Sequence, residues 1–392
     1  MKICDLTQFY SPVSGGVKRY VHEKVRYLHR YTEDSHILII PGAKDERIVE
    51  GRSTVYTIAS PLLSRTSRYR ALWRLEAIED ILTQEMPDVI ESGDPYQVAW
   101  KAVASGEGLG IPVVGFYHSH FPEAYVRSVS RYFGKTASEF MMDIARRYVR
   151  SLYNRFSYTL VPSPALAGVL EEWGVENVSN IDLGVDTDVF HPEIDDAADT
   201  RREYEIPCDR MLLLYVGRLA HEKNTRTLFE AFRQLFRTAP NRYHLMVVGD
   251  GLQRSLVQEL QAETQQVTWL SYCAEPERLA RLYRAADLFV HPGVQETFGL
   301  VTLESQAWGT PVVGIRGSYM DRIIHSDQQL WADENTPGSL ADAIHNTSGG
   351  NLKMAGRQAS MAVRARYSWR LVFDRLFGIY RDAIASYNAL NA

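Results

Sequence analysis

The chain has 392 residues, more than one typical hydrophobic core accommodates, so its length predicts two domains. Hydrophobic residues make up 45% and charged residues 23% of the sequence, a balance typical of folded soluble proteins. The formal net charge is -5 and no long run carries one sign, which argues against duplex nucleic acid as a partner.

The cysteines and the N-terminal residues indicate the cellular compartment in which the protein is expected. Cys4, Cys208 and Cys273 are widely spaced and form neither a metal-ligand pattern nor a disulfide framework. Asp5 interrupts any apolar signal-peptide core, and no segment approaches the roughly 20 apolar residues that a membrane-spanning helix needs. We therefore expect a cytoplasmic protein whose only membrane contact would be peripheral, at the inner face.

The first half of the chain alternates between two hydrophobic periodicities. Strands are expected at residues 2–9, 36–40, 88–91, 113–117 and 159–161. Helices are expected at residues 17–30, 71–82, 137–156 and 164–173. Such alternation predicts a parallel sheet covered by helices on both faces.

The alternation restarts after an acidic, poorly periodic stretch, residues 184–205, where we place the domain linker. The second series of strands is expected at residues 212–216, 244–248, 267–270, 288–291 and 311–314, with helices between them. An amphipathic helix is expected from residue 367 to about 390. The sequence thus predicts two α/β domains, residues 1–183 and 184–367, and a final helix over 368–392.

One region, residues 127–155, is basic with interleaved aromatic residues. A helix of that composition can lie on an anionic bilayer. The alternative is a solvated helix face with its aromatic residues in the core, and Glu139 and Asp143, which interrupt the basic run, favour this alternative.

Two carboxylates, Glu296 and Glu304, stand eight residues apart around Phe298-Gly299-Leu300, between two predicted strands. The carboxyl ends of parallel strands are where open sheets bind ligands, and the N–H groups at a helix start attract phosphate. Carboxylates can also accept hydrogen bonds from sugar hydroxyls. Phosphate together with a polyol indicates a sugar nucleotide.

Positive charge follows the strand expected at residues 212–216. Gly217 lets the backbone turn, Arg218 offers a planar fork of donors, and Lys223 offers a mobile point charge. Together the two cations can neutralise a diphosphate, both when bound and as its charge grows during bond cleavage. A solvated Arg and Lys near a helix start is the alternative, and the helix dipole disfavours it.

Two further positions lie at strand ends of the first half. Gly16 closes a Gly-Gly pair between the first strand and the first helix, where a phosphate-cradling turn and a plain tight turn are both possible. His118 follows the strand at 113–117, where it can bond a sugar hydroxyl or simply be a polar residue at a strand exit. His118 and His120 alone do not make a metal site.

Several of these segments resemble one family. Glu296-Thr297-Phe298-Gly299, Glu304 and the following Gly-Thr-Pro-Val-Val resemble the E-x7-E motif of the retaining GT-B glycosyltransferases, specifically glycosyltransferase family 4 (glycosyl transferases group 1). Residues 217–224 resemble its G-R-L-x-x-E-K-G segment, with Asn224 in place of the final Gly. The resemblance runs nearly end to end and is strongest over residues 217–313.

The resemblance implies the GT-B architecture, with two Rossmann-like domains whose parallel sheets face a central cleft. The first domain would take the acceptor side, the second would bind the donor nucleotide, and the C-terminal helix would cross back to the first domain. The implied activity moves a hexose from a UDP- or GDP-linked sugar to a hydroxyl of a lipid, glycan or small-molecule acceptor. No cofactor and no metal are expected, and no nucleic acid partner.

The resemblance also assigns roles. Catalytic residues would be Glu296, which holds hydroxyls of the donor sugar, His118, which contacts the sugar from the other domain, and the diphosphate-binding Arg218 and Lys223. Further donor-binding residues would be Gly16, Gly217, Tyr272 near the base, Phe298, Gly299, Leu300 and Glu304 on the ribose.

Alternatives remain open at this point. Glu296 could act as a covalent nucleophile, although same-face attack, in which the leaving phosphate takes the acceptor's proton, fits the family better. A sugar-nucleotide epimerase of the same fold and a non-catalytic nucleotide-sugar binder are the rival functions. The sequence identifies neither the base, the hexose, the acceptor nor the oligomeric state.

Overall fold

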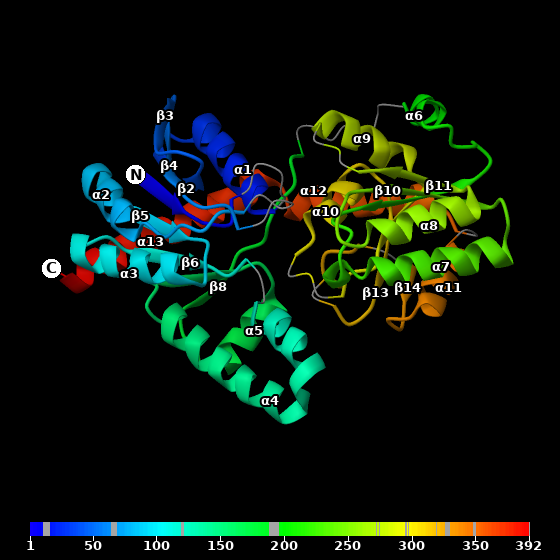
Figure 1. The fold of residues 1–392 in the computed structure, drawn as a ribbon. Coiled ribbons are helices and arrows are strands. Elements are labelled where there is room, and N and C mark those ends of the chain that lie inside the picture. Colours follow the sequence, from blue (N-terminus) through cyan, green and yellow to red (C-terminus); the bar gives the residue numbers. More distant parts are fainter. Residues whose placement is uncertain are drawn as a thin grey trace. The chain divides into compact units, whose positions relative to one another are not determined.

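The computed structural model (Figure 1) describes residues 1–10, 16–63, 69–118, 121–187, 196–271, 273, 275–294, 296, 298–318, 320–325, 330–347 and 350–391, with their side chains except those of residues 121, 123–136 and 391. The chain divides into two compact units. The first is Met1–Leu183 together with Trp369–Ala392, and the second is Gly184–Ser368.

The first unit is built on an eight-stranded sheet of order β3-β4-β2-β1-β5-β6-β7-β8. Its strands are β1 Lys2–Leu6, β2 Ser35–Gly42, β3 Glu46–Glu50, β4 Ser53–Ala59, β5 Val89–Ser92, β6 Val113–Phe116, β7 Tyr158–Val161 and β8 Val178–Asn180. All neighbours pair in parallel except β3 and β4, which are antiparallel. The chain runs from β1 outward in both directions, so the topological switch point lies between β1 and β5.

Helices cover both faces of this sheet. They are α1 Gly16–Tyr31, α2 Leu75–Glu85, α3 Gln97–Leu109, α4 Phe121–Tyr153, α5 Pro164–Glu172 and the C-terminal α13 Trp369–Asn391. The last helix packs beside α1, where Tyr27 contacts Phe373 and Phe377 at ring-centroid distances of 5.4 and 5.0 Å. Side chains more than 340 residues apart in sequence therefore share one core.

A buried ion cluster lies under this helix pair. Lys24 of α1 is fully buried, and its Nζ lies 2.7 Å from Asp5 Oδ1 and 3.0 Å from Glu91 Oε1. Its Nζ also donates to the Tyr380 hydroxyl of α13 at 2.9 Å. Burial alone would raise the pKa of Asp5, but Lys24 and a hydrogen bond from His36 hold that pKa below its usual value. The cluster joins β1, β5, α1 and α13 through charge rather than apolar contact.

The second unit contains a six-stranded parallel sheet of order β11-β10-β9-β12-β13-β14. The strands are β9 Met211–Val216, β10 Tyr243–Val248, β11 Val267–Leu270, β12 Leu288–His291, β13 Val312–Ile315 and β14 Trp331–Ala332. The helices are α6 Ala197–Glu203, the 3-10 turn η1 His221–Lys223, α7 Thr225–Thr238, α8 Arg254–Thr264, α9 Pro276–Ala285, α10 Leu300–Ala307, α11 Pro337–Thr347 and α12 Leu352–Arg366. Here the switch point lies between β9 and β12.

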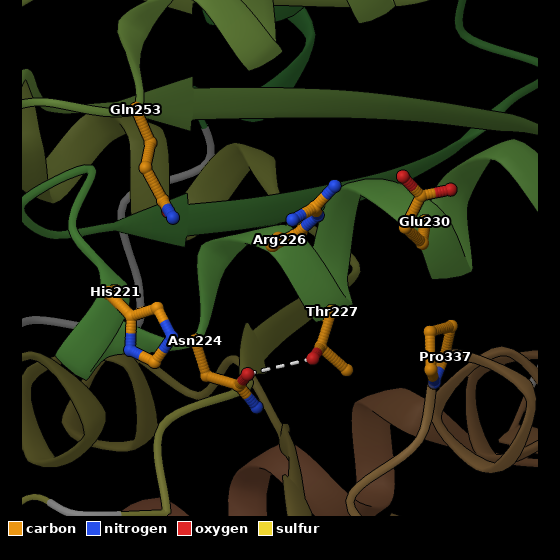
Figure 2. A pocket seen from close by; sticks show the side chains of 7 residues that line it. All are labelled: His221, Asn224, Arg226, Thr227, Glu230, Gln253 and Pro337. Atoms are coloured by element: carbon orange, nitrogen blue, oxygen red, sulfur yellow. Dashed lines mark hydrogen bonds between the residues drawn. The ribbon is translucent and has the colours of Figure 1, made fainter. Parts of the chain in front are cut away.

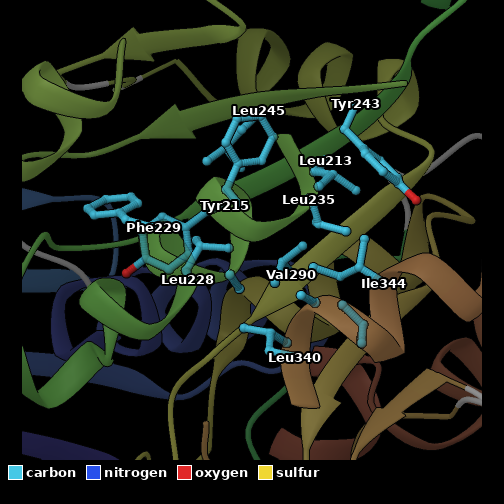
Figure 3. Close-up of a cluster of buried hydrophobic side chains, with 14 of the residues drawn as sticks. Leu213, Tyr215, Leu228, Phe229, Leu235, Tyr243, Leu245, Val290, Leu340 and Ile344 are labelled. Carbon is cyan, nitrogen blue, oxygen red and sulfur yellow. The ribbon is translucent and has the colours of Figure 1, made fainter. Parts of the chain in front are cut away.

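One face of this sheet holds a large apolar core (Figure 3). Alternate strand residues such as Leu213, Leu245 and Val290 point into it, and α7 and α11 close it with Leu228 and Ile344. Because parallel strands are covered on both faces, they read as continuous apolar runs in the sequence. This core fixes the strand ends from which the candidate site is built.

The structure corrects several expected elements. The expected linker contains α6, which is tied to α9 by ion pairs from Asp196 to Arg284 and from Glu203 to Arg281. The β3–β4 hairpin was not expected, because β3 is an exposed edge strand with charged ends and no buried face. Helix α3 was also missed, since its two glycines and serine are poor helix formers.

Three expected boundaries differ as well. Helix α4 begins at Phe121 rather than near residue 137, with Pro122 in its first turn, where proline is tolerated. Helix α2 begins at Leu75 instead of residue 71, and β1 ends at Leu6 instead of residue 9. Within the described residues, no helix combines the length and apolar character that crossing a membrane requires.

Candidate active site

The predicted cationic and acidic residues meet at the switch point of the second sheet. Gly217 to Lys223 follow β9, and the loop that carries Glu296 follows the adjacent strand β12. Lys223 Nζ lies 2.7 Å from Glu296 Oε1, which closes the gap between the two loops. Segments 73 residues apart in sequence are thus joined where open α/β sheets bind ligands.

The electrostatics of Glu296 fit a carboxylate that stays ionised. Its side chain is only 14% exposed, and burial alone would raise its pKa. The charge and hydrogen bond of Lys223, with a smaller contribution from the charge of Arg218, help to outweigh burial, so the pKa of Glu296 is lowered. Arg218 therefore lies near enough to act on the same carboxylate, and an ionised Glu296 is available to accept hydrogen bonds.

Asn224 explains how Lys223 reaches Glu296. Its backbone is left-handed, with φ of 55°, a conformation that asparagine tolerates better than most residues. Its side-chain amide donates to the Pro292 carbonyl at 2.9 Å, and Thr227 Oγ1 donates to its Oδ1 at 2.7 Å. The asparagine that departs from the family's glycine thus keeps the backbone geometry and also ties the lysine turn to the end of β12.

The turn after β9 packs closely against the end of β10, and this contact requires a glycine at residue 249. A Cβ atom on Gly249, at the end of β10, would lie 1.9 Å from the Gly217 carbonyl oxygen, so only glycine lets the two backbones approach. Arg218 projects from this turn with a side chain that is 64% exposed and pairs with Glu222 at 3.1 Å. It can exchange that surface pair for a ligand at little cost.

The turn before α10 offers backbone groups rather than side chains. Phe298 is 3% exposed, and its ring packs against Tyr367 at a centroid distance of 6.3 Å. Gly299 caps α10 in a left-handed conformation with φ of 75°, and a Cβ there would lie 2.2 Å from Met320 Cε. The backbone N–H groups from Leu300 are therefore what this helix start offers to an anion, and their contact with a donor stays a prediction.

Glu304 lies on α10, the expected helix. It is 8% exposed and accepts a hydrogen bond from the Tyr283 hydroxyl at 3.1 Å. That bond fixes the rotamer of the carboxylate. Its contact with a ribose stays a prediction.

His291, the last residue of β12, lies beside Glu296 but is not among the site residues predicted from the sequence. It is 3% exposed, and its Nε2 has no hydrogen-bond partner among the described residues. That nitrogen lies 3.8 Å from Glu296 Oε1, too far for a hydrogen bond. Burial, more than any charge nearby, lowers the pKa of His291, so the ring is neutral beside the carboxylate.

In the first unit, His118 follows β6 and its ring stacks on Phe116 at 3.9 Å. Tyr20 meets the same ring edge-on at 5.5 Å. Burial, with a smaller contribution from Lys24, lowers the pKa of His118 to about 3, so it is a neutral hydrogen-bonding group near pH 7. Gly16 begins α1, and a Cβ there would meet nothing within 4 Å. Their predicted donor contacts stay predictions.

Asp94 marks the switch point of the first sheet, and sequence reasoning missed it. It follows β5, is 1% exposed, and its Oδ2 accepts a hydrogen bond from the Gln8 amide, after β1, at 2.7 Å. Burial raises the pKa of Asp94 to about 7 despite that bond and one from Thr7. A buried titratable carboxyl at a strand end shows no periodic signal in a sequence.

Asp94 predicts a measurable pH dependence. An unfolded aspartate titrates near pH 3.9, so between about pH 4 and 7 the folded state binds one more proton and the free energy of unfolding falls as pH rises. The total is about 4 kcal/mol for a fully buried group. His118 acts oppositely below about pH 6.5, because its folded pKa is depressed. The Asp94→Asn variant should therefore gain stability relative to the wild type as pH rises.

Urea unfolding of both proteins at several pH values between 4.5 and 7.5 checks this difference. Asparagine keeps an oxygen that accepts from the Gln8 amide, so the variant retains the bond that joins β5 to the segment after β1. Parallel pH curves for the two proteins would show that Asp94 does not titrate in this range.

Two predicted features are not placed by these contacts. Tyr272, the predicted base contact, lies outside the described residues. Among the residues that the structure describes, no group of three potential metal ligands occurs, and the expectation of a metal-free reaction stays a prediction.

A hollow of about 290 Å³ lies beside the turn that carries Lys223, and it is lined by His221, Asn224, Arg226 and others (Figure 2). It includes none of the predicted donor residues.

Comparison with known proteins places this geometry in a family. Residues 14–189 match the model described as Glycosyltransferase Family 4, and residues 196–355 match Glycosyl transferases group 1. A D-inositol 3-phosphate glycosyltransferase of Thermobispora bispora is 30% identical over 301 residues, covering 74% of this chain and 68% of that protein. The chain belongs to glycosyltransferase family 4. The glycosyltransferase predicted from its motifs is thereby confirmed.

Two further comparisons extend along most of the glycosyltransferase. A GDP-mannose-dependent alpha-(1-6)-phosphatidylinositol dimannoside mannosyltransferase of Mycobacterium tuberculosis is 29% identical over 349 residues, covering 88% of this chain and 87% of that protein. The solved sucrose-phosphate synthase of Thermosynechococcus elongatus superposes with a TM-score of 0.77 at 21% identity, covering 98% and 99%. The predicted GT-B fold is therefore confirmed. None of the three relatives is named an epimerase.

Proposed function

We propose that this glycosyltransferase transfers mannose from GDP-mannose, with retention of configuration, to a hydroxyl of a polyol or glycolipid. The geometry that carries the proposal is the Lys223–Glu296 pair over the switch point of the second sheet, with Arg218 close enough to affect the same carboxylate. The choice of GDP-mannose rests on the relative that matches over 88% of the chain.

The cations would hold the diphosphate of the donor. Arg218 exchanges its exposed bond to Glu222 for phosphate oxygens, and Lys223 supplies a second charge from the adjacent turn. The N–H groups at Leu300 and onward support the same diphosphate at the start of α10. Charge that develops on the leaving phosphate then meets groups already in place, which lowers the barrier without a metal ion.

Two carboxylates would recognise the hydroxyl groups of the donor. Glu296 is ionised and accepts hydrogen bonds from the mannose, while Glu304, held by Tyr283, accepts from the ribose. Donor binding would separate Lys223 from Glu296 in part, since the lysine turns to phosphate. In the absence of donor, Lys223 therefore compensates the negative charge of the buried Glu296 carboxylate.

Retention would follow from attack on the same face of the sugar. The acceptor oxygen bonds to the anomeric carbon as the bond from that carbon to the phosphate oxygen breaks, and the leaving phosphate takes the acceptor's proton. We assign Glu296 to the sugar hydroxyls rather than to nucleophilic attack, because same-face attack needs no covalent intermediate on the protein. His118, neutral in the first unit, would contact the mannose.

Membrane contact is part of the proposal for a glycolipid acceptor. On α4, Phe140 is 67% and Ile144 51% exposed, one helical turn apart. Arg147, three residues after Ile144 on the same helix, pairs with Asp143 and is 81% exposed. Such a mixture of exposed apolar and basic residues supports peripheral contact with an anionic surface at the inner membrane face.

The donor assignment predicts a selective stabilisation. GDP-mannose should raise the melting temperature more than UDP-glucose, UDP-galactose or ADP-glucose at equal concentration, because a ligand that binds only the folded state stabilises it. Differential scanning fluorimetry over this panel makes the measurement, with GDP and UDP alone separating the base from the sugar. A larger shift with a UDP-sugar would reject the choice of base.

Turnover distinguishes transfer from the rival functions. Incubation of GDP-mannose alone should give at most slow hydrolysis to GDP and mannose, whereas adding inositol-containing acceptors should accelerate GDP release. Conversion of the donor into a different sugar nucleotide would identify an epimerase. Donor binding without hydrolysis or transfer across the acceptor panel would identify a non-catalytic binder.

A further inference from the structure

A second cavity of the second unit, which we call the α12 cavity, has a volume of about 410 Å³. Arg322 and His325 line it from the segment that follows β13, and Gln358 and Arg366 line it from α12. None of these residues takes part in the site described above. The cavity therefore needs an explanation of its own.

Its lining is rich in hydrogen-bond donors. Arg366 forms no ion pair within the described part of the chain. The Nε2 of His325 is buried, and no hydrogen-bond partner occurs for it among the described residues. Burial, and then the charge of Arg366, lower the pKa of His325, as expected of an imidazole that faces a cation without an anion between them.

The one acidic lining residue is turned to its own loop. Asp321 Oδ2 accepts from the Gly317 amide at 2.9 Å, and Asp321 Oδ1 accepts from both the amide and the hydroxyl of Ser318 at 3.1 Å. Both carboxylate oxygens are thus engaged. The described lining also contains two guanidinium groups, an imidazole and an amide, a set of donors that suits an oxyanion.

The basic residues beside the α12 cavity have a simpler explanation, which accounts for part of these observations. Arg364 and Arg366 both lie in the last turn of α12, where cations interact favourably with the helix dipole. That effect accounts for basic residues at this position. It does not account for the cavity or for a buried imidazole nitrogen that has no partner in the described part of the chain, and Arg364 does not line the cavity.

We propose that the α12 cavity binds a phosphate oxyanion, as free phosphate or as a phosphomonoester group, between the guanidinium groups of Arg322 and Arg366 and the imidazole of His325. Arg guanidinium forks match phosphate geometry, and a phosphate would also give the His325 Nε2 a hydrogen-bond partner. The site is separate from the diphosphate site at Lys223, because it shares no residue with it.

Phosphate in the α12 cavity would affect the turn at residues 298–300, which precedes α10 and which we propose contacts the donor. Arg322 Cζ lies 5.6 Å from the centre of the Phe298 ring, and Met320 occupies the space beside Gly299. The His325 amide donates to Gln306 Oε1 of α10 at 2.7 Å. The segment that would hold the phosphate thus contacts both the donor turn and the helix after it, so phosphate should alter donor affinity.

The test uses His325 as a local reporter. Its imidazole C–H signal is assigned in the spectrum of histidine-labelled protein by comparison with His325→Gln, and is titrated with pH at constant ionic strength with and without inorganic phosphate. Phosphate should raise the pKa of His325 in the wild type and in Arg364→Gln, a charge-matched control on the same helix turn. In Arg366→Gln the phosphate concentration needed should rise about tenfold or more.

Two results would overturn the proposal: a His325 signal that ignores phosphate in the wild type, or equal phosphate responses in the two arginine variants. The reporter is independent of the donor site, so failure here leaves the proposed transfer untouched. Cosedimentation with vesicles that contain phosphatidic acid, a lipid phosphomonoester, against phosphatidylcholine vesicles, separates the sources of phosphate. Loss of sedimentation in Arg366→Gln alone assigns the site to a lipid headgroup, and equal sedimentation of both variants assigns it to a soluble phosphate compound.

Discussion

Replacing Lys223 by alanine should lower kcat for transfer by about 10²- to 10³-fold, the usual effect of removing one preorganised group that stabilises charge in a transition state. Glu296→Gln should cause a loss of similar size, because glutamine keeps the shape of the side chain but not its charge. Arg226→Ala removes an exposed cation in the first turn of α7, three residues after Lys223, and serves as the matched control, with near wild-type kcat expected. Initial rates of GDP release with a saturating acceptor provide the measurement.

The double variant tests whether the two residues act as a unit. Their side chains are 2.7 Å apart, and residues in direct contact have non-additive effects. We therefore expect Lys223→Ala with Glu296→Gln to lose much less than the product of the single losses. Circular dichroism and melting temperature confirm that each variant is folded. Additive losses, or near-normal rates in both single variants, would remove this pair from the active site.

The sequence was most informative where burial makes a pattern regular. The strands at residues 267–270 and 288–291 have the expected bounds, and β9 and β10 differ from expectation by one residue. Strands β9, β10 and β12 lie inside the sheet, where helices cover both faces, so they read as uninterrupted apolar runs, whereas β11 is an edge strand. The motif residues Lys223 and Glu296 were placed by their position after such strands, and their contact agrees with that placement.

The sequence was least informative where structure depends on distant partners. Exposed β3 has no buried face to set an alternating pattern. His291 and Asp94 stand at strand ends like many other polar residues, and only their burial distinguishes them. The sequence shows Asn224 where the family has glycine, but its bond to the Pro292 carbonyl joins positions 68 residues apart, and nothing in local spacing indicates it.

Replacing the buried Lys24 by methionine should destabilise the first unit by about 3 to 5 kcal/mol, because it leaves Asp5 and Glu91 buried without their shared cation. Tyr380→Phe should cost less, since it removes hydrogen bonds to Lys24 and Glu91 but leaves the charges paired. Methionine is unbranched and only one heavy atom shorter than lysine, so the change removes the charge and keeps most of the packing. Urea unfolding at pH 7 measures both losses.

Acidification should distinguish a charge effect from a packing effect. In the wild type Asp5 has a lowered pKa, so its contribution to stability is present above about pH 4 and is lost as pH falls further. Without Lys24 the two carboxyl groups can take up protons at higher pH and escape burial as ions, so the deficit of Lys24→Met should shrink between pH 7 and 5. Lys353→Met, an exposed control on α12, should show almost no deficit at either pH. A pH-independent deficit in Lys24→Met would mean that lost packing, not unpaired charge, causes the destabilisation.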